Sequence, residues 1–202
     1  MGSRDTSLEG RADSAVSVES ATASGAASRI RIGVSSCLAG QPVRYDGGHK
    51  LDRSVAQLLA AQFELVPVCP EVEAGMGVPR EPVQLVRGGD DVVRMLGVRS
   101  RIDHTDAMQQ FARARVAGLA RSGICGYVLK TGSPSCGARE VPVSSAAGTA
   151  SAASGLFAAE LLRAMPELPV VEEDRLADEA ALDAFARRVR ECARKRSCQR
   201  RY

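Results

Sequence analysis

The sequence predicts an α/β protein: a single Rossmann-like or flavodoxin-like domain with a mostly parallel sheet and an inserted hairpin. Two observations lead to this prediction. Short apolar segments with Ile and Val alternate along the chain with longer segments of helical periodicity. Such an alternation gives right-handed β-α-β units, whose strands are parallel. Two further apolar segments on either side of a Gly-Gly turn predict a hairpin between these units.

The chain divides into three parts by composition. Residues 1–29 are rich in Ser, Ala and Gly and have no apolar period, so we expect a disordered N-terminal extension. Residues 30–190 are expected to form the α/β domain. Residues 191–202 form a basic tail, for which a solvated, frayed C-terminus is expected. The 45% of hydrophobic residues in the chain are enough to build one core.

Composition also limits the partners and the location. Aromatic residues make up only 3% of the chain and Trp is absent, which argues against stacking on single-stranded nucleic acid. No apolar run reaches the roughly 20 residues that span a membrane. The N-terminus lacks the apolar core of a signal peptide and carries acidic residues, so we expect a cytoplasmic protein, monomeric or homodimeric. Its six cysteines should be reduced there unless they bind metal.

Residues 29–34 and 63–68 form the first two expected strands. Between them, Asp52 is expected to cap a helix with Val55, Leu58 and Leu59 on its apolar face. The segment after the second strand, residues 70–82, holds three prolines and two glycines and predicts a long irregular loop. Loops of this length are often functional.

The second half of the chain repeats this alternation. The expected elements are hairpin strands at 83–86 and 91–98, a helix from Thr105 or Asp106, a strand at 123–129, a helix capped by Ser154, a strand at 168–171 and a helix from Asp178. The apolar faces of these helices are Met108, Phe111, Ala112, Val116 and Leu119; then Leu156, Phe157, Leu161 and Leu162; then Leu182, Phe185, Val189 and Cys192. Small residues at 144–154 predict a loop.

Three cysteines, Cys37, Cys69 and Cys136, each lie in a loop that follows an expected strand. If the strands are parallel, these loops meet at one edge of the sheet, where open α/β sheets bind ligands. Spacing alone is a weak metal signal, because no CxxC pair is present and structural zinc sites usually close with four ligands. Three thiolates also suit a 4Fe–4S cluster whose fourth iron stays open.

The other three cysteines are expected to play no part in this site. Cys125 lies inside an apolar segment and is expected to be a small core residue. Cys192 and Cys198 are six residues apart on the last helix, which places them about 120° apart and disfavours joint ligation.

Polar residues beside the three cysteines are candidates for chemistry. Glu71 follows Cys69 by two residues and could move protons, although a solvated loop carboxylate would look the same. Ser133 and Ser135 precede Cys136 and could orient a water or a substrate oxygen, or simply stabilise the turn. Arg44 and Arg80 could bind a carboxylate or a polarised carbonyl.

These stretches, taken together, resemble a known bacterial family. Three motifs occur in the family's order: Ser35-Ser36-Cys37-Leu38-Ala39-Gly40 with Arg44-Tyr45-Asp46-Gly47, then Cys69-Pro70-Glu71 with Gly75 and Pro79-Arg80, then Ser133-Pro134-Ser135-Cys136-Gly137. The family was long known only as a domain of unknown function, and its characterised members are 2-thiouracil desulfidases. The resemblance runs from about residue 30 to about residue 190.

The resemblance implies a cofactor and a set of roles. Family members hold a 4Fe–4S cluster through three cysteines that match Cys37, Cys69 and Cys136, and the open iron binds the thiocarbonyl sulfur of the substrate. A Glu that matches Glu71 and a Ser that matches Ser133 assist hydrolysis. The remaining expected substrate-binding residues are Arg44, Tyr45, Asp46, Gly47, Arg80 and Ser135.

The expected activity is therefore non-redox desulfuration of a small thio-heterocycle such as 2-thiouracil, in which C=S becomes C=O and hydrogen sulfide is released. Three alternatives stay open at this point. They are a different sulfur-transfer enzyme with an open cluster, a dehydratase of that kind, and a non-enzymatic module that binds zinc or senses redox state.

Overall fold

The computed structural model describes residues 29–145, 148 and 151–199. Except for Arg29, the extension expected at residues 1–29 lies outside this part of the chain. The basic tail is described as far as residue 199, where it is the end of helix α4 (Glu179–Gln199). In the described ranges, no helix is both long enough and apolar enough to cross a bilayer.

The first sheet contains the parallel strands that the sequence predicts. It consists of β1 (Arg31–Ser35), β2 (Glu64–Val68), β5 (Tyr127–Leu129) and β8 (Val170–Glu172), in the order β2-β1-β5-β8. All three pairings are parallel. The carboxyl ends of the four strands therefore share one edge, and the chain leaves that edge through the loops that carry the three motif cysteines.

The second sheet contains the expected hairpin, β3 (Val83–Arg87) and β4 (Val93–Gly97), which pair antiparallel. This hairpin is joined by β6 (Val141–Ser145), parallel to β3, and then by β7 (Ser151–Ala153). The expectation of a loop throughout 144–154 is therefore wrong at both ends. The small side chains carry no apolar period, but pairing with a neighbouring strand satisfies their backbone groups.

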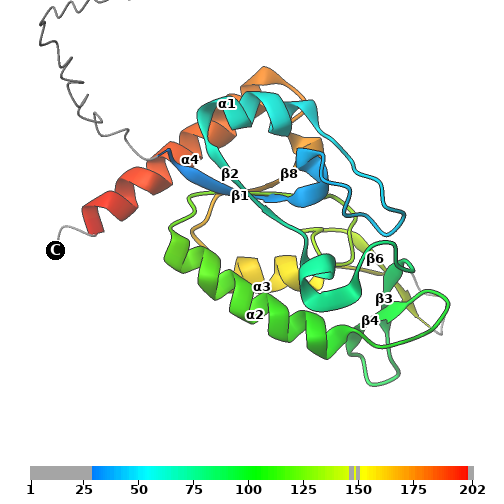
Figure 1. The fold of residues 1–202 in the computed structure, drawn as a ribbon. Coiled ribbons are helices and arrows are strands. Elements are labelled where there is room, and N and C mark those ends of the chain that lie inside the picture. The colour runs from blue at the N-terminus through cyan, green and yellow to red at the C-terminus, as the bar shows by residue number, and fades with distance from the viewer. Residues whose placement is uncertain (1–28, 146–147, 149–150, 200–202) are drawn as a thin grey trace, which may run out of the picture.

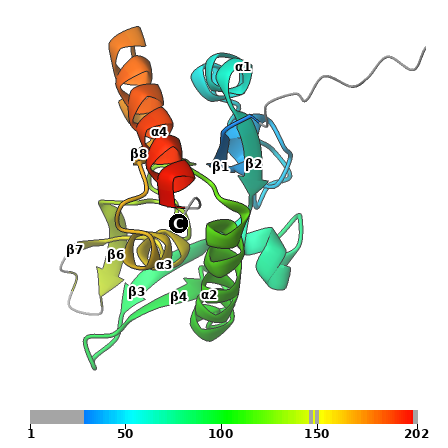
Figure 2. The ribbon, with the colours of Figure 1, turned by 90° about the vertical axis from the view of Figure 1, so that its left-hand side faces the viewer.

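Helices cover both faces of the first sheet (Figure 1). One face holds the π-helical segment η2 (Ser54–Leu59), α1 (Ala60–Gln62) and α4. The other face holds α2 (Thr105–Ser122) and α3 (Leu156–Ala164), and the second sheet lies on the same side (Figure 2). The domain is thus a mixed α/β fold with a parallel sheet between helix layers, as predicted.

Two helix starts follow the expected capping chemistry, but the cap expected at Ser154 is wrong: α3 begins after Gly155 without a side-chain cap, and the Ser154 hydroxyl donates to Ala138 O instead. Asp52 Oδ1 accepts a hydrogen bond from Val55 N at 3.0 Å, and Asp178 Oδ1 accepts one from Ala181 N at 2.8 Å. Two expected core residues are instead exposed at the surface, Leu58 to 51% and Leu162 to 36%. Each lies next to a residue that does take the buried position, Leu59 or Leu161.

Three short helical turns stand at the edge of the first sheet that carries the loops. They are η1 (Ser36–Ala39), η3 (Val72–Met76) and η4 (Glu173–Arg175), which follow β1, β2 and β8. The loop expected at residues 70–82 therefore begins with a helical turn, which points the side chains that follow Cys69 in different directions.

Candidate functional site

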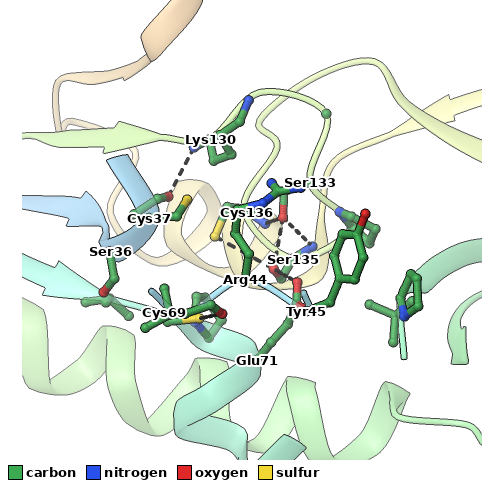
Figure 3. A pocket seen from close by; sticks show the side chains of 18 of the residues that line it. Ser36, Cys37, Arg44, Tyr45, Cys69, Glu71, Lys130, Ser133, Ser135 and Cys136 are labelled. Atoms are coloured by element: carbon green, nitrogen blue, oxygen red, sulfur yellow. Dashed lines mark hydrogen bonds between the residues drawn. The ribbon is translucent and has the colours of Figure 1, made fainter. Parts of the chain in front are cut away.

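A cavity of about 230 Å³ opens at the carboxyl edge of the first sheet. Its wall is formed by the segments that follow β1, β2 and β5, together with the start of β3. Cys37 lies in η1 after β1, Cys69 directly after β2, and Cys136 in the loop after β5; all three line this cavity. Figure 3 shows their side chains around one space. The parallel register of the sheet thus brings together residues far apart in sequence.

The three thiols are shielded from water to different degrees. Cys37 and Cys69 are half-buried, while Cys136 is only 5% exposed. Burial raises the pKa of all three thiols, and it raises that of Cys136 to about 12. A metal centre that binds them as thiolates must therefore displace their protons.

Glu71 lies on the cavity wall and is held from two sides. Its Oε2 accepts hydrogen bonds from Arg80 Nη2 at 2.6 Å and from Arg80 Nε at 2.9 Å. Its Oε1 accepts one from Ser135 Oγ at 2.8 Å. The Arg80 side chain is 8% exposed and that of Glu71 is 13%, so the pair is nearly buried.

Arg80 is expected to bind substrate, but most of its donors are used within the protein. Besides Glu71, it donates from Nη1 to the carbonyl oxygens of Val43 at 3.1 Å and Gly77 at 2.8 Å. Val43 O also accepts a hydrogen bond from Cys69 Sγ at 3.7 Å. Arg80 therefore ties Glu71 to the segment after β1, and this arrangement leaves it little capacity for a ligand.

The two serines before Cys136 form a chain of hydrogen bonds with Glu71 (Figure 3). Ser135 Oγ lies between Glu71 Oε1 at 2.8 Å and Ser133 Oγ at 3.1 Å. Ser133 Oγ in turn accepts a hydrogen bond from Cys136 N at 3.1 Å. Ser135 is buried, with 1% of its surface exposed, whereas Ser133 is half-buried on the cavity wall.

The other expected substrate-binding residues lie in the turn after β1. Arg44 and Tyr45 line the cavity, and the Arg44 guanidinium carbon is 5.3 Å from the centre of the Tyr45 ring. Asp46 and Gly47 are described but lie outside the cavity wall. Asp46 Oδ1 accepts a hydrogen bond from Gly48 N at 3.0 Å and lies 3.7 Å from Arg44 Nε, so it shapes the turn.

Glu73 supports Cys69 from the side of the loop that faces α2. Its Oε1 accepts a hydrogen bond from Cys69 N at 3.0 Å, and its own N donates to Cys69 O at 2.9 Å. Its Oε2 lies 3.0 Å from Arg115 Nε of α2. The two carboxylates of this turn thus have different surroundings: Glu71 lines the cavity and Glu73 anchors the backbone.

Sequence reasoning missed Lys130 and Glu173. Lys130 lines the cavity, and its Nζ donates to Thr131 O at 2.9 Å and pairs with Glu173 Oε1. The position of Lys130, between an expected strand and Cys136, was a usable signal. Glu173 had none, because its contact depends on the pairing of β5 with β8.

The arrangement of thiols is compatible with a cluster. In the part of the chain that the structure describes, no three His, Cys, Asp or Glu side chains converge closely enough to hold one metal ion. A cubane cluster binds each thiolate at a different iron, so its ligands stand around a space instead of meeting at a point. Three thiols from three loops around one cavity meet this requirement.

Comparison with known proteins extends this result. A sequence model of the family described as 2-thiouracil desulfurase matches residues 32–173. The uncharacterised protein YbbK of Bacillus subtilis (strain 168) is 32% identical over 149 residues, which cover 72% of this chain and 97% of YbbK. A solved structure of the 4Fe–4S-dependent thiouracil desulfidase TudS superposes with a TM-score of 0.61 at 32% identity, covering 78% of this chain and 99% of that one.

The matched residues include all three cysteine motifs, the cavity wall and both sheets, and they end at Glu173, before helix α4. The resemblance predicted from these motifs is therefore confirmed. The chain belongs to the 2-thiouracil desulfurase family.

Proposed function

We propose that this protein removes sulfur from a small thiolated heterocycle of the 2-thiouracil type by hydrolysis. The reaction consumes one water, converts C=S to C=O and releases one hydrogen sulfide, so no electrons are gained or lost. Membership of the desulfurase family and the likeness to TudS support this assignment. The observation that carries it is the single cavity that joins three thiols with the Glu71–Ser135–Ser133 chain of hydrogen bonds.

We propose that Cys37, Cys69 and Cys136 hold a 4Fe–4S cluster, the cofactor that TudS carries in its name. When bound, such a cluster supplies one iron without a protein ligand, a Lewis acid suited to a soft sulfur donor. The half-buried Cys37 and Cys69 and the buried Cys136 all line the cavity and would hold the cluster there.

Glu71 is the proposed proton acceptor for the attacking water. Arg80 occupies Oε2, so Oε1 is the oxygen that can exchange its bond from Ser135 for one from water. A carboxylate in this position can take a proton as the water adds to the thiocarbonyl carbon and return it to the departing sulfur. The nearly buried Arg80 keeps the carboxylate fixed while this happens.

Ser133 and Ser135 have separate proposed roles. Ser135 lines the cavity but is only 1% exposed, and its hydroxyl donates to Glu71 Oε1, so its proposed role is to orient Glu71. Ser133 is also on the cavity wall; its one hydroxyl proton goes to Ser135 Oγ while Ser135 donates to Glu71, so we propose that Ser133 exchanges this bond for one to the water or to a ring atom of the heterocycle. Arg44 and Tyr45 form the outer wall, where a flat ring and a polar substituent would lie.

The size of the cavity favours a small molecule. At about 230 Å³ it is slightly smaller than the range of roughly 300–1,000 Å³ typical of ligand pockets. A free heterocycle suits such a space better than a base within folded nucleic acid. The proposed partner is therefore a small thio-heterocycle, and the protein is proposed to work as a monomer or homodimer.

The test is product analysis under anaerobic conditions. Protein reconstituted with iron and sulfide should convert 2-thiouracil to uracil in water labelled with heavy oxygen, without any electron donor. The account predicts one labelled oxygen in each uracil and one hydrogen sulfide for each uracil formed. Sulfur recovered on an acceptor molecule would point to a sulfur-transfer enzyme, and a requirement for reductant would contradict the hydrolytic reaction.

A further inference from the structure

Two consecutive carboxylates, Glu172 at the end of β8 and Glu173 at the start of η4, contact both ends of one loop. This loop, residues 130–138, is called the Cys136 loop below, and it carries Ser133, Ser135 and Cys136. Glu172 has an extended backbone (φ −90°, ψ 148°). Successive side chains of an extended chain point to opposite sides, so the two neighbours can reach different parts of the loop.

Glu173 holds the first end of the loop. Its Oε2 accepts hydrogen bonds from Thr131 N at 2.7 Å and from Thr131 Oγ1 at 3.0 Å. Its Oε1 pairs with Lys130 Nζ. The Glu173 side chain is 12% exposed and that of Lys130 is 21% exposed, so water competes only weakly for these bonds.

Glu172 holds the other end. It is 9% exposed, and its Oε1 accepts a hydrogen bond from Ala138 N at 2.9 Å. The carbonyl oxygen of the same residue, Ala138, accepts one from Ser154 Oγ at 2.6 Å. A buried carboxylate that receives a backbone N–H makes a charge-assisted hydrogen bond, which is stronger than a neutral one.

The middle of the loop is held by a different element, the start of α3. Leu156 N donates to Pro134 O, and Phe157 N and Ala158 N both donate to Ser135 O, each at 3.1 Å. The start of α3 thus fixes the centre of the loop. Each end receives a carboxylate, from Glu173 or from Glu172, beside single bonds to Ser35 Oγ at one end and from Gly155 N at the other. Neither carboxylate lines the cavity, so each acts on it through the residues that it holds.

We propose that Glu172 and Glu173 are positioning residues of the cluster site, which set the places of Cys136 and Ser133 by holding both ends of the Cys136 loop. This proposal rests on the proposed function in one respect, namely that the loop helps to bind a cluster. The test therefore starts with the accessibility of the thiols in cluster-free protein. This quantity depends neither on bound metal nor on turnover.

The first measurement is the rate at which each thiol is alkylated in cluster-free protein, followed peptide by peptide by mass spectrometry. Glu172→Ala and Glu173→Ala should each raise the alkylation rate of Cys136 on the order of tenfold, because each loses charge-assisted hydrogen bonds that keep the loop closed. Cys69, on a different loop, should keep its rate. Asp174→Ala is the matched control, since Asp174 is the next residue in η4 and is exposed.

Conservative variants separate positioning from general destabilisation. Glu172→Gln keeps an oxygen that can accept from Ala138 N, so its Cys136 rate should stay near that of the parent chain. Thr131→Val removes only the hydroxyl bond to Glu173 and should have a small effect in the same direction. If an alanine variant does not fold, Thr131→Val decides for the Glu173 end: a Cys136 rate equal to that of Asp174→Ala would count against the proposal.

Two results would overturn the proposal. One is a Cys136 rate in both alanine variants equal to that of Asp174→Ala. The other is a parallel rise in the alkylation rates of Cys37, Cys69 and Cys136, which would indicate global unfolding.

A second measurement uses the reconstituted protein. Loss of iron to a chelator should also be faster in Glu172→Ala and Glu173→Ala than in the control. Failure of the parent chain to bind iron would contradict the proposed function, while the thiol rates still decide the role of the two carboxylates.

Discussion

Glu71 has a cation on one oxygen and a hydroxyl on the other, which suits a carboxylate that must stay fixed while it exchanges one partner. Glu71→Gln keeps the size of the side chain and can still accept from Ser135. We expect this variant to retain its cluster and to lose roughly 10²–10⁴-fold in turnover, the usual contribution of general acid–base catalysis. Iron content checks the retention of the cluster, and hydrogen sulfide release from the same sample checks the loss of turnover.

The control for this variant is Glu179→Gln, because Glu179 is exposed at the start of α4. It should match the parent chain in both measurements. Full turnover of Glu71→Gln would remove the proton-transfer role. Loss of iron from Glu71→Gln would instead make Glu71 a residue that supports the cluster.

Arg80 should matter for stability as well as for activity. Removing one partner of a buried ion pair leaves the other charge uncompensated, at a cost of about 3–5 kcal/mol. We expect Arg80→Met to lower the free energy of unfolding of the cluster-free protein by an amount near this range, measured in urea. The double variant Arg80→Met/Glu71→Gln should recover part of the loss. Equal free energies of unfolding for Arg80→Met and the parent chain would show that the Arg80–Glu71 ion pair does not stabilise the fold.

The sequence indicated which residues form the site more reliably than it indicated which side chains contact one another. The motifs singled out Cys37, Cys69, Cys136, Glu71 and Ser133, and all of them line one cavity. Arg80 was expected to bind substrate, yet it holds Glu71, because the chain turns back after η3 and brings residues nine apart together. That reversal depends on tertiary packing and leaves no periodic signal in the sequence.

Among the strands, β1 and β5 make an unusually close contact. Gly33 pairs with Tyr127, and a Cβ at Gly33 would lie 2.2 Å from Tyr127 Cδ2. Tyr127 is fully buried, so its ring has no free space into which it can move. We expect Gly33→Ala to lower the free energy of unfolding by about 1–3 kcal/mol, the usual cost of overpacking a core.

Gly89→Ala is the control for this prediction, because a Cβ at Gly89 would have no other heavy atom within 4 Å. Urea unfolding of the two variants should separate them clearly. A Gly33→Ala variant as stable as Gly89→Ala would mean that the sheet adjusts freely at β1 and β5.

Strands with a clear apolar pattern were predictable, and strands of small residues were not. β1, β2 and the β3–β4 hairpin stand where Ile, Val and Leu are bounded by turn residues. β7 is built from Ser151, Ala152 and Ala153, which carry no strand signal and pair only because β6 offers a partner. Tertiary pairing overrides local propensity in this case.

The whole molecule should lose stability in acid, partly through carboxylates around the second sheet. Hydrogen bonds from the Ser100 hydroxyl and from the Ser100 and Arg99 amides lower the pKa of Glu81 to about 2. Hydrogen bonds from the Arg94 side chain lower the pKa of Asp90 below its ordinary range. A depressed pKa in the folded state stabilises that state above the unfolded pKa, and this contribution is lost as the pH falls through the folded pKa.

For Glu81 the window runs from its ordinary pKa of 4.5 down to about 2. We expect the free energy of unfolding to fall with pH across this window, measured by urea unfolding of the cluster-free protein. Glu81→Gln should show a weaker dependence on pH there, because its side chain does not titrate. An identical dependence in the two chains would show that Glu81 does not contribute.

The fold class was predictable because strands and helices alternate, but the division into two sheets was not. Alternation specifies parallel β-α-β units without saying which strands share a sheet. β3 pairs with β6, more than fifty residues away in the chain, and this pairing turns an inserted hairpin into half of a second sheet. The three cysteines all follow strands of the first sheet, so their meeting could be anticipated, although the part of the wall that β3 supplies could not.

The most direct test of the account is the iron and sulfide content of the anaerobically reconstituted protein, with each of Cys37, Cys69 and Cys136 changed in turn to Ala. The account predicts about four irons and four sulfides per chain in the parent protein, with loss of the cluster in each of the three variants. Cys198→Ala, on the exposed end of α4, should keep the full content. A parent protein that takes up zinc instead of iron, or a cluster that survives the loss of any one of the three thiols, would contradict it.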